Sequence, residues 1–161
     1  MNFYDSAYQE PPITDMLFGL CDDKNGGVAY IDRNTQNRWI AVIKNEKKSS
    51  LIFTAIDKGV IKDNEEPGRG RCDGMFTSTE HIYFVELKDQ RKDWKSDAIK
   101  QLESTIQFFI ANHDITIYRH KKAFACNKKQ PQFQRIENEL NLRFFKIYGV
   151  RLVIQAEIVF Q

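Results

Sequence analysis

The sequence predicts an α/β domain in which a mixed central sheet is flanked by helices and preceded by an N-terminal β-meander. Three observations support this class: short apolar runs between turn signals up to residue 56, a nearly continuous apolar segment at residues 81–87, and two later segments with helical periodicity. The 161 residues are expected to form one domain. Its core spans about residues 50–126, with a β extension at 13–45 and a C-terminal helix and strand at 131–160.

The N-terminal third contains four runs of β-branched and aromatic residues: MLFGLC, VAYID, RWIAVI and LIFTAI. Polar turn clusters such as DDKNGG separate them. This pattern is typical of consecutive antiparallel strands. A helix over residues 13–21 is an alternative reading of the first run.

The segment at residues 72–89 is predicted to form a β-hairpin. If residues 79–80 make the loop, Asp73 lies directly opposite Glu86, with Cβ atoms roughly 5 Å apart on one face. Because side chains alternate along a strand, Lys88 lies on the same face as Glu86. A register slip of one residue would separate the three groups.

Residues 94–112 have the periodicity of an amphipathic helix, with Ser96 or Asp97 as its cap. Its apolar stripe consists of Ala98, Leu102, Thr105, Ile106 and Phe109. A strand, or a strand with a turn, follows at residues 115–127. A second helix is expected after Pro131, ending at Gly149; its stripe consists of Phe133, Ile136, Leu140, Phe144 and Ile147. Residues 150–160 predict one closing strand.

The hairpin carries the chemistry that the sequence suggests. HIYFVEL is typical of a strand buried on both faces, so two facing carboxylates at its end would repel each other in a poorly solvated place. A divalent cation, Mg²⁺ or Mn²⁺, would compensate, because Mg²⁺ is held by one or two carboxylates together with water and phosphate. An adjacent lysine suits phosphodiester hydrolysis, since it offsets charge in the transition state. Taken alone, an E-x-K tripeptide is too common to indicate function.

The ordered run RCDGMF, IYFVELKD and AIKQLESTIQFF resembles the core motif of the PD-(D/E)XK nuclease superfamily, which has the restriction-endonuclease-like fold. The resemblance implies that Asp73 and Glu86 bind the metal, together with the backbone carbonyl of Leu87. It implies that Lys88 is the catalytic lysine and that Gln101 is the polar helix residue of the site. It covers about residues 50–126. The RCD, VELK and QL pattern also resembles small uncharacterised bacterial proteins.

Two departures from the family pattern stand out. Cys72 occupies the place of the motif proline, and no upstream helix supplies a further acid. Asp57, at the end of LIFTAI, and Glu46 are the candidates for an additional carboxylate. Asp57 also suits a simple turn position. Without a third acid, a single-metal site or an inactive site is expected.

The leading functional prediction is a Mg²⁺-dependent endonuclease acting on nucleic acid, DNA in preference to RNA. The excess of nine bases over three acids in residues 119–161 fits a polyanionic partner, although solvated faces explain it equally well. The resemblance implies a homodimer. Candidate nucleic-acid contacts, with base stacking by the tryptophan, are Arg71, Arg91, Lys92, Trp94 and Lys95.

Two other functions remain open at this stage. One is a catalytically inactive binding module of the same fold, with a nucleic-acid or protein partner, for instance an immunity or regulatory factor. The other is a metal-dependent enzyme for a smaller phosphate ester.

The chain lacks an apolar run long enough to span a membrane, and its polar N-terminus is unlike a secretory signal, so a cytoplasmic location is expected. The three cysteines are expected to be buried free thiols, and His81 is expected to be solvated.

Overall fold

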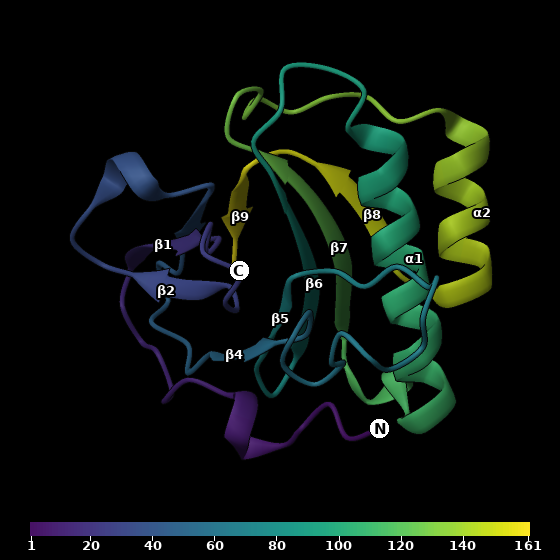
Figure 1. The fold of residues 1–161 in the computed structure, drawn as a ribbon, viewed down its shortest axis with the longest axis horizontal. Coiled ribbons are helices and arrows are strands. Elements are labelled where there is room, and N and C mark those ends of the chain that lie inside the picture. The colour runs from purple at the N-terminus through teal and green to yellow at the C-terminus, as the bar shows by residue number, and fades with distance from the viewer.

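The computed structural model describes residues 1–161 and has three layers (Figure 1). Helices α1 (Lys95–Asn112) and α2 (Asn138–Tyr148) cover one face of a five-stranded sheet, and a four-stranded sheet lies against the other face. Short 3₁₀ helices are η1 (Ser6–Tyr8), η2 (Gln36–Arg38) and η3 (Ile115–Ile117). The chain is therefore an α/β protein with two mixed sheets and two helices. Neither helix combines the length and apolar character needed to cross a bilayer.

The five-stranded sheet has the order β4-β5-β6-β7-β8. Its strands are β4 (Ile52–Ala55), β5 (Gly74–Thr77), β6 (His81–Lys88), β7 (His120–Asn127) and β8 (Arg151–Ile154). The β4–β5 and β5–β6 pairs are antiparallel, whereas β6–β7 and β7–β8 are parallel. The carboxyl ends of β4, β6 and β7 therefore meet at one edge of the sheet.

The predicted register of the β5–β6 hairpin is confirmed. Gly74 pairs with Val85 and Thr77 with Ile82, and the amide of Ser78 donates to the carbonyl of His81 at 3.0 Å across the loop. The prediction that His81 is solvated is wrong. Its side chain is buried, because its ring stacks on His120 with centroids 4.8 Å apart.

The N-terminal strands do not form a meander, which corrects the prediction. Strands β1 (Leu17–Cys21), β2 (Tyr30–Asp32) and β3 (Ala41–Lys44) have the order β2-β1-β3, so β1 is central and β3 pairs with β1. The fourth strand, β9 (Glu157–Val159), pairs with β3 in parallel. The run at residues 51–56 leaves this group altogether, since β4 joins the other sheet. A helix at residues 13–21 is likewise excluded.

The single closing strand predicted at residues 150–160 is in fact two strands, β8 and β9, one in each sheet. The chain bends at residues 155–156, where the amide of Ala156 donates to the carbonyl of Pro131. An apolar run of this length fits one long strand or two short ones equally well. Its periodicity therefore could not predict the crossing.

Helix α1 matches the sequence prediction, and all five residues of its stripe are buried. Neither Ser96 nor Asp97 caps it, because the N-cap residue is Trp94 and no side chain accepts there. Helix α2 begins later than predicted and ends as predicted at Gly149, which has a left-handed φ of 69°. Of its predicted stripe only Phe144 is fully buried, whereas Phe133 and Ile147 are exposed.

Two buried clusters occupy the spaces between the three layers. One lies between the helices and the five-stranded sheet and includes Met75 and Phe84. The other lies between the two sheets and includes Val85 and Leu87. Successive β6 side chains thus point alternately to the helices and to the second sheet, so Glu86 points toward the helices. The three cysteines are buried and free, as predicted.

Candidate functional site

Two carboxylates meet where β5 begins and β6 ends. Asp73 comes directly before β5, and its amide donates to the carbonyl of Val85 at 3.1 Å. Its Oδ2 accepts the amide of Leu87 at 2.7 Å, which fixes the side chain against β6. This places the carboxyl group of Asp73 within hydrogen-bonding reach of the carboxyl group of Glu86.

The surroundings of both carboxyl groups disfavour negative charge. Burial raises the pKa of Asp73 to about 6, although hydrogen bonds from Glu86 and the Leu87 amide act in the opposite direction. Burial, and then the neighbouring charge of Asp73, hold the pKa of Glu86 well above its ordinary value. Like charges in a poorly solvated place have this effect. The two groups therefore titrate as a pair and favour a shared positive charge between them.

Lys88 supplies the nearest positive charge. Its Nζ lies 3.2 Å from Oε2 of Glu86, and both side chains are largely buried, at 14% and 4% exposure. The other carboxylate oxygen of Glu86, Oε1, is buried without any hydrogen-bond donor. The Lys88 ammonium group thus reaches one oxygen of Glu86, whereas no protein group donates a hydrogen bond to the other.

An unpartnered buried carboxylate oxygen is costly, and native structures rarely contain one without a reason. At this position a proton or a cation would satisfy Oε1 of Glu86. The donor set fits a hard divalent cation such as Mg²⁺ or Mn²⁺, because it offers two carboxylates and therefore only oxygen ligands. The residues present are therefore compatible with the metal that the sequence suggested.

Gln101, on α1, packs beside the segment that leads into Asp73. A Cβ added at Gly70 would lie 3.2 Å from its Cγ, so the two residues are in close contact. Its Oε1 is a second buried oxygen without a donor, and no hydrogen bond joins Gln101 to Lys88. The structure places Gln101 near the start of β5, with a free acceptor.

The third acid that the sequence left open is not supplied. Glu46 lies in an exposed turn beyond the far end of β3, away from the site. Asp57 lies nearby, since its charge contributes to the raised pKa of Asp73, but its Oδ1 accepts the guanidinium of Arg71 at 2.8 Å. No group of three or more His, Cys, Asp or Glu side chains is arranged to hold a metal ion. Side-chain ligands at this place are thus limited to the two carboxylates of Asp73 and Glu86.

Sequence reasoning missed two residues at this edge. Asp22 follows β1 directly, and its charge also raises the pKa of Asp73. Asn127 ends β7 opposite Lys88; its Oδ1 accepts the amide of Gln90 at 3.1 Å and its Nδ2 donates to that residue's carbonyl at 2.7 Å. A signal for Asn127 was available, because it ends an apolar strand parallel to β6. No local signal marked Asp22, which comes from the other sheet.

The predicted nucleic-acid contacts divide into two groups. Trp94 is buried and its indole donates to Gln130 at 3.1 Å, so the prediction of base stacking is wrong. Arg71 is held by Asp57 and Asp63 at 2.8 and 3.0 Å, so its charge is already neutralised.

The three remaining candidates are exposed and available to a partner. They lie in the loop that joins β6 to α1 and at the start of α1: Arg91, Lys92 and Lys95.

Comparison of the chain with protein-family models, with curated proteins and with solved structures gave no match.

Proposed function

We propose that this chain is a Mg²⁺- or Mn²⁺-dependent nuclease that hydrolyses phosphodiester bonds, with DNA as its expected substrate. One observation carries the proposal. Oε1 of Glu86 is buried without a donor beside the carboxyl group of Asp73, while Lys88 lies 3.2 Å from the other oxygen. An apolar pair of similar size would be more stable here, so the charges are best explained by a ligand that requires them.

The order of the parts supports the nuclease resemblance. The acid Asp73 stands at the start of one strand, Glu86 and Lys88 lie on the next, and the following helix carries Gln101 beside the first strand. A mixed sheet with helices on one face fits the expected restriction-endonuclease-like fold.

The roles of the residues follow from their positions. Asp73, Glu86 and the carbonyl of Leu87 would hold the cation, which when bound polarises a phosphate and lowers the pKa of water. Lys88 keeps one oxygen of Glu86 in place and presents an ammonium group to the charge that develops on the phosphate. Gln101 offers a free acceptor that orients water near the start of β5.

A cleavage assay tests this function. The purified protein is incubated with plasmid, linear, single-stranded and branched DNA in Mn²⁺, alongside Lys88→Ala and the matched control Lys47→Ala. Lys47 is an exposed lysine in the turn after β3. Cleavage should be lost with Lys88→Ala and kept with Lys47→Ala. Equal cleavage by both variants would show that the activity belongs to another site or to a contaminant.

A nuclease-fold binding module without activity is the second candidate. The presence of only two carboxylates as side-chain ligands favours this inactive module, and so does the near-complete burial of Glu86. Such a module would bind its nucleic-acid or protein partner equally well with Asp73→Asn in place and would show no cation binding. A homodimer remains a prediction from the resemblance, and sedimentation of the purified protein tests it.

A further inference from the structure

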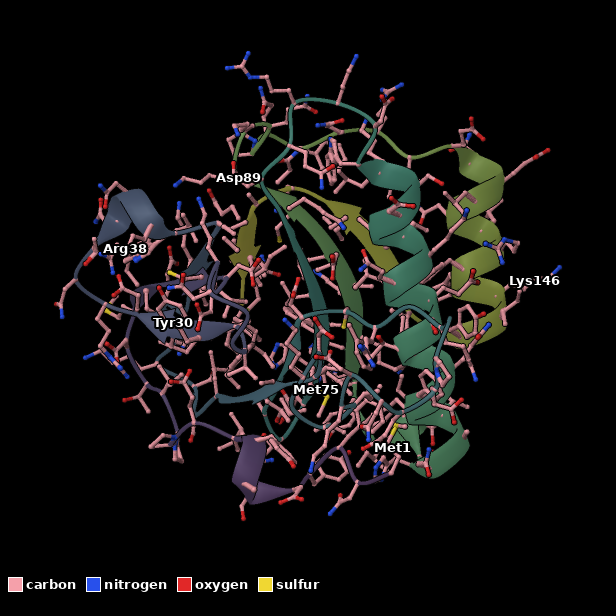
Figure 2. All side chains as sticks on the ribbon, viewed as in Figure 1. Met1, Tyr30, Arg38, Met75, Asp89 and Lys146 are labelled. Atoms are coloured by element: carbon pink, nitrogen blue, oxygen red, sulfur yellow. The ribbon has the colours of Figure 1, made fainter.

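A polar hollow of about 330 Å³ lies between the end of β6 and the loops of the four-stranded sheet. Its walls come from the loop after β1, from β2 and η2, and from the residues that follow β6 and β7. Figure 2 shows Arg38 and Tyr30 on the side of the four-stranded sheet and Asp89 at the end of β6. Residues far apart in sequence thus build one concave surface.

The hollow adjoins the acid pair through the backbone. Asp89 directly follows Lys88, and the amide of Lys128 donates to the carbonyl of Lys88 at 2.9 Å. Asp22 lines the hollow and is also close enough to Asp73 to raise its pKa. Because Lys88 lies on the helix side of β6, a chain-like ligand would have to pass over the end of β6 to reach both places.

Two of the three acids of the hollow already have partners. Asp89 forms ion pairs with Lys24 at 3.7 Å and Lys129 at 3.4 Å. The carboxylate of Asp23 accepts the amide of Asn25 at 2.8 Å, which closes the turn after β1. Asp22 forms no ion pair, and it lies at the carboxylate end of the site, where its charge acts on Asp73.

Two cations of the hollow form no ion pair, although the charge of Arg38 is near enough to Asp32 to help lower the pKa of that carboxyl group. Arg38 forms no ion pair, and neither does Lys128. The Nζ of Lys128 donates to the carbonyl of Asn37 at 2.5 Å, which holds the ammonium group beside η2 and its neighbour Arg38. Unpaired cations of this kind in a concave site fit an anionic ligand, and a guanidinium fork suits the oxygens of a phosphate.

We propose that Arg38 and Lys128 bind a phosphodiester group of a nucleic-acid strand, next to the phosphate that the proposed function would place at Glu86 and Lys88. This inference rests on the proposed function and makes it more specific. A second phosphate site fits a substrate with at least two linked phosphates, which a nucleic-acid strand supplies and a phosphate monoester does not. A small phosphate monoester would leave Arg38 and Lys128 unused.

Binding without cleavage tests the inference. Fluorescence anisotropy of a labelled single-stranded oligonucleotide is measured in EDTA over a range of KCl concentrations, in a Lys88→Ala background. With Arg38→Gln and Lys128→Gln together, affinity should fall, and the slope of log K against log salt should shrink by about 0.7, the value for one phosphate contact. Arg38→Lys, which keeps the charge, should retain most of the slope. A mononucleotide should compete poorly.

The matched control removes two exposed cations that do not line the hollow, Arg135→Gln with Lys146→Gln. Figure 2 shows Lys146 on α2, opposite the hollow. The control should leave the slope unchanged. Equal losses in both double variants would overturn the proposal, because the effect would then be one of net charge. A mononucleotide that binds as tightly as the oligonucleotide would overturn the polynucleotide assignment.

The proposed function can fail separately from this inference. If Arg38 and Lys128 govern the salt slope while no DNA is cleaved in Mn²⁺, the phosphate site stands and the nuclease activity does not. If cleavage depends on Lys88 while replacing Arg38 and Lys128 leaves binding unchanged, the nuclease activity stands and this phosphate site is wrong.

Discussion

At the scale of single residues, the acid pair has the character of a functional site rather than of a stabilising contact. Two carboxyl groups with raised pKa values face each other, and one oxygen has no donor. Proteins tolerate such a local loss of stability mainly where function requires it. Replacing the charged groups by neutral ones of the same shape should therefore stabilise the fold and abolish the activity.

The pH dependence of stability gives the first test. The folded-state pKa of Asp73, about 6, lies above its ordinary value of 3.8, so the native state binds the proton more tightly. The stability that this proton provides is complete below pH 3.8 and is lost as the pH rises through 6. Asp73→Asn should therefore raise the free energy of unfolding by about 1–3 kcal/mol at pH 8, with little effect near pH 4.

Urea unfolding of wild type and Asp73→Asn at several pH values, in metal-free buffer, measures this difference. Asp93→Asn is the control, since Asp93 is exposed in the loop before α1. Parallel curves for wild type and Asp73→Asn across the pH range would show that Asp73 is ionised without cost in the folded protein.

At the scale of elements, helix α1 positions the hairpin through one buried hydroxyl. The Oγ1 of Thr105 accepts the amide of Cys72 at 2.7 Å and donates to the carbonyl of Gln101 at 2.9 Å. Cys72 is the residue before Asp73. The helix thus fixes the point at which the chain enters β5, and with it the carboxyl group of Asp73.

Thr105→Val keeps the shape of the side chain and removes this acceptor. The buried amide of Cys72 would lose its partner, so the free energy of unfolding should fall by about 1–3 kcal/mol. Chemical denaturation measures this loss.

Ser104→Ala on the same helix is the control. The Oγ of Ser104 is buried without a partner, so its removal should be neutral or stabilising. Similar losses for Thr105→Val and Ser104→Ala would contradict the role given to Thr105.

The sequence predicted those elements whose contacts are local. The register of the β5–β6 hairpin follows from a two-residue loop and a side-chain period of two, and the α1 stripe follows from helical spacing around Leu102. Pairings between distant segments could not be derived in this way. The central place of β1, the bend that sends β9 into the other sheet, and the approach of Asp22 to Asp73 depend on how the two sheets pack.

At the scale of the whole molecule, one apolar cluster joins the two sheets. Phe160, just after β9, is buried and stacks on Tyr83 of β6 with centroids 4.6 Å apart and rings 21° from parallel. It also meets Phe76 of β5 edge to face. Neither sheet buries this face without the other, so they should unfold together.

The two tryptophans allow a test of this cooperativity, because they lie in different layers. Trp39 packs against Gly19 in the four-stranded sheet, and Trp94 packs in the cluster under the helices. The variants Trp39→Phe and Trp94→Phe each keep a single tryptophan. Each is unfolded in urea and followed by fluorescence and by circular dichroism. In each variant the two signals should give coincident unfolding transitions. Separate fluorescence and dichroism midpoints in either variant would indicate two independently folding units.

Phe160→Ala should lower the free energy of unfolding by about 3–5 kcal/mol, the usual cost of removing a buried phenylalanine ring. Because the ring contacts strands of the five-stranded sheet from the end of β9, both fluorescence signals should shift together. Each signal is followed in the corresponding single-tryptophan background. A shift of the Trp39 signal alone would contradict the shared core.

Calorimetric titration with Mn²⁺ is the most direct test of the carboxylate pair as a metal site. Wild type and Glu80→Gln, which changes an exposed acid at the other end of the same hairpin, should bind one ion with equal affinity. Asp73→Asn and Glu86→Gln should each lose that binding while remaining folded. Equal binding by all four proteins, or no binding by wild type at millimolar Mn²⁺, would contradict the assignment of Asp73 and Glu86 as metal ligands.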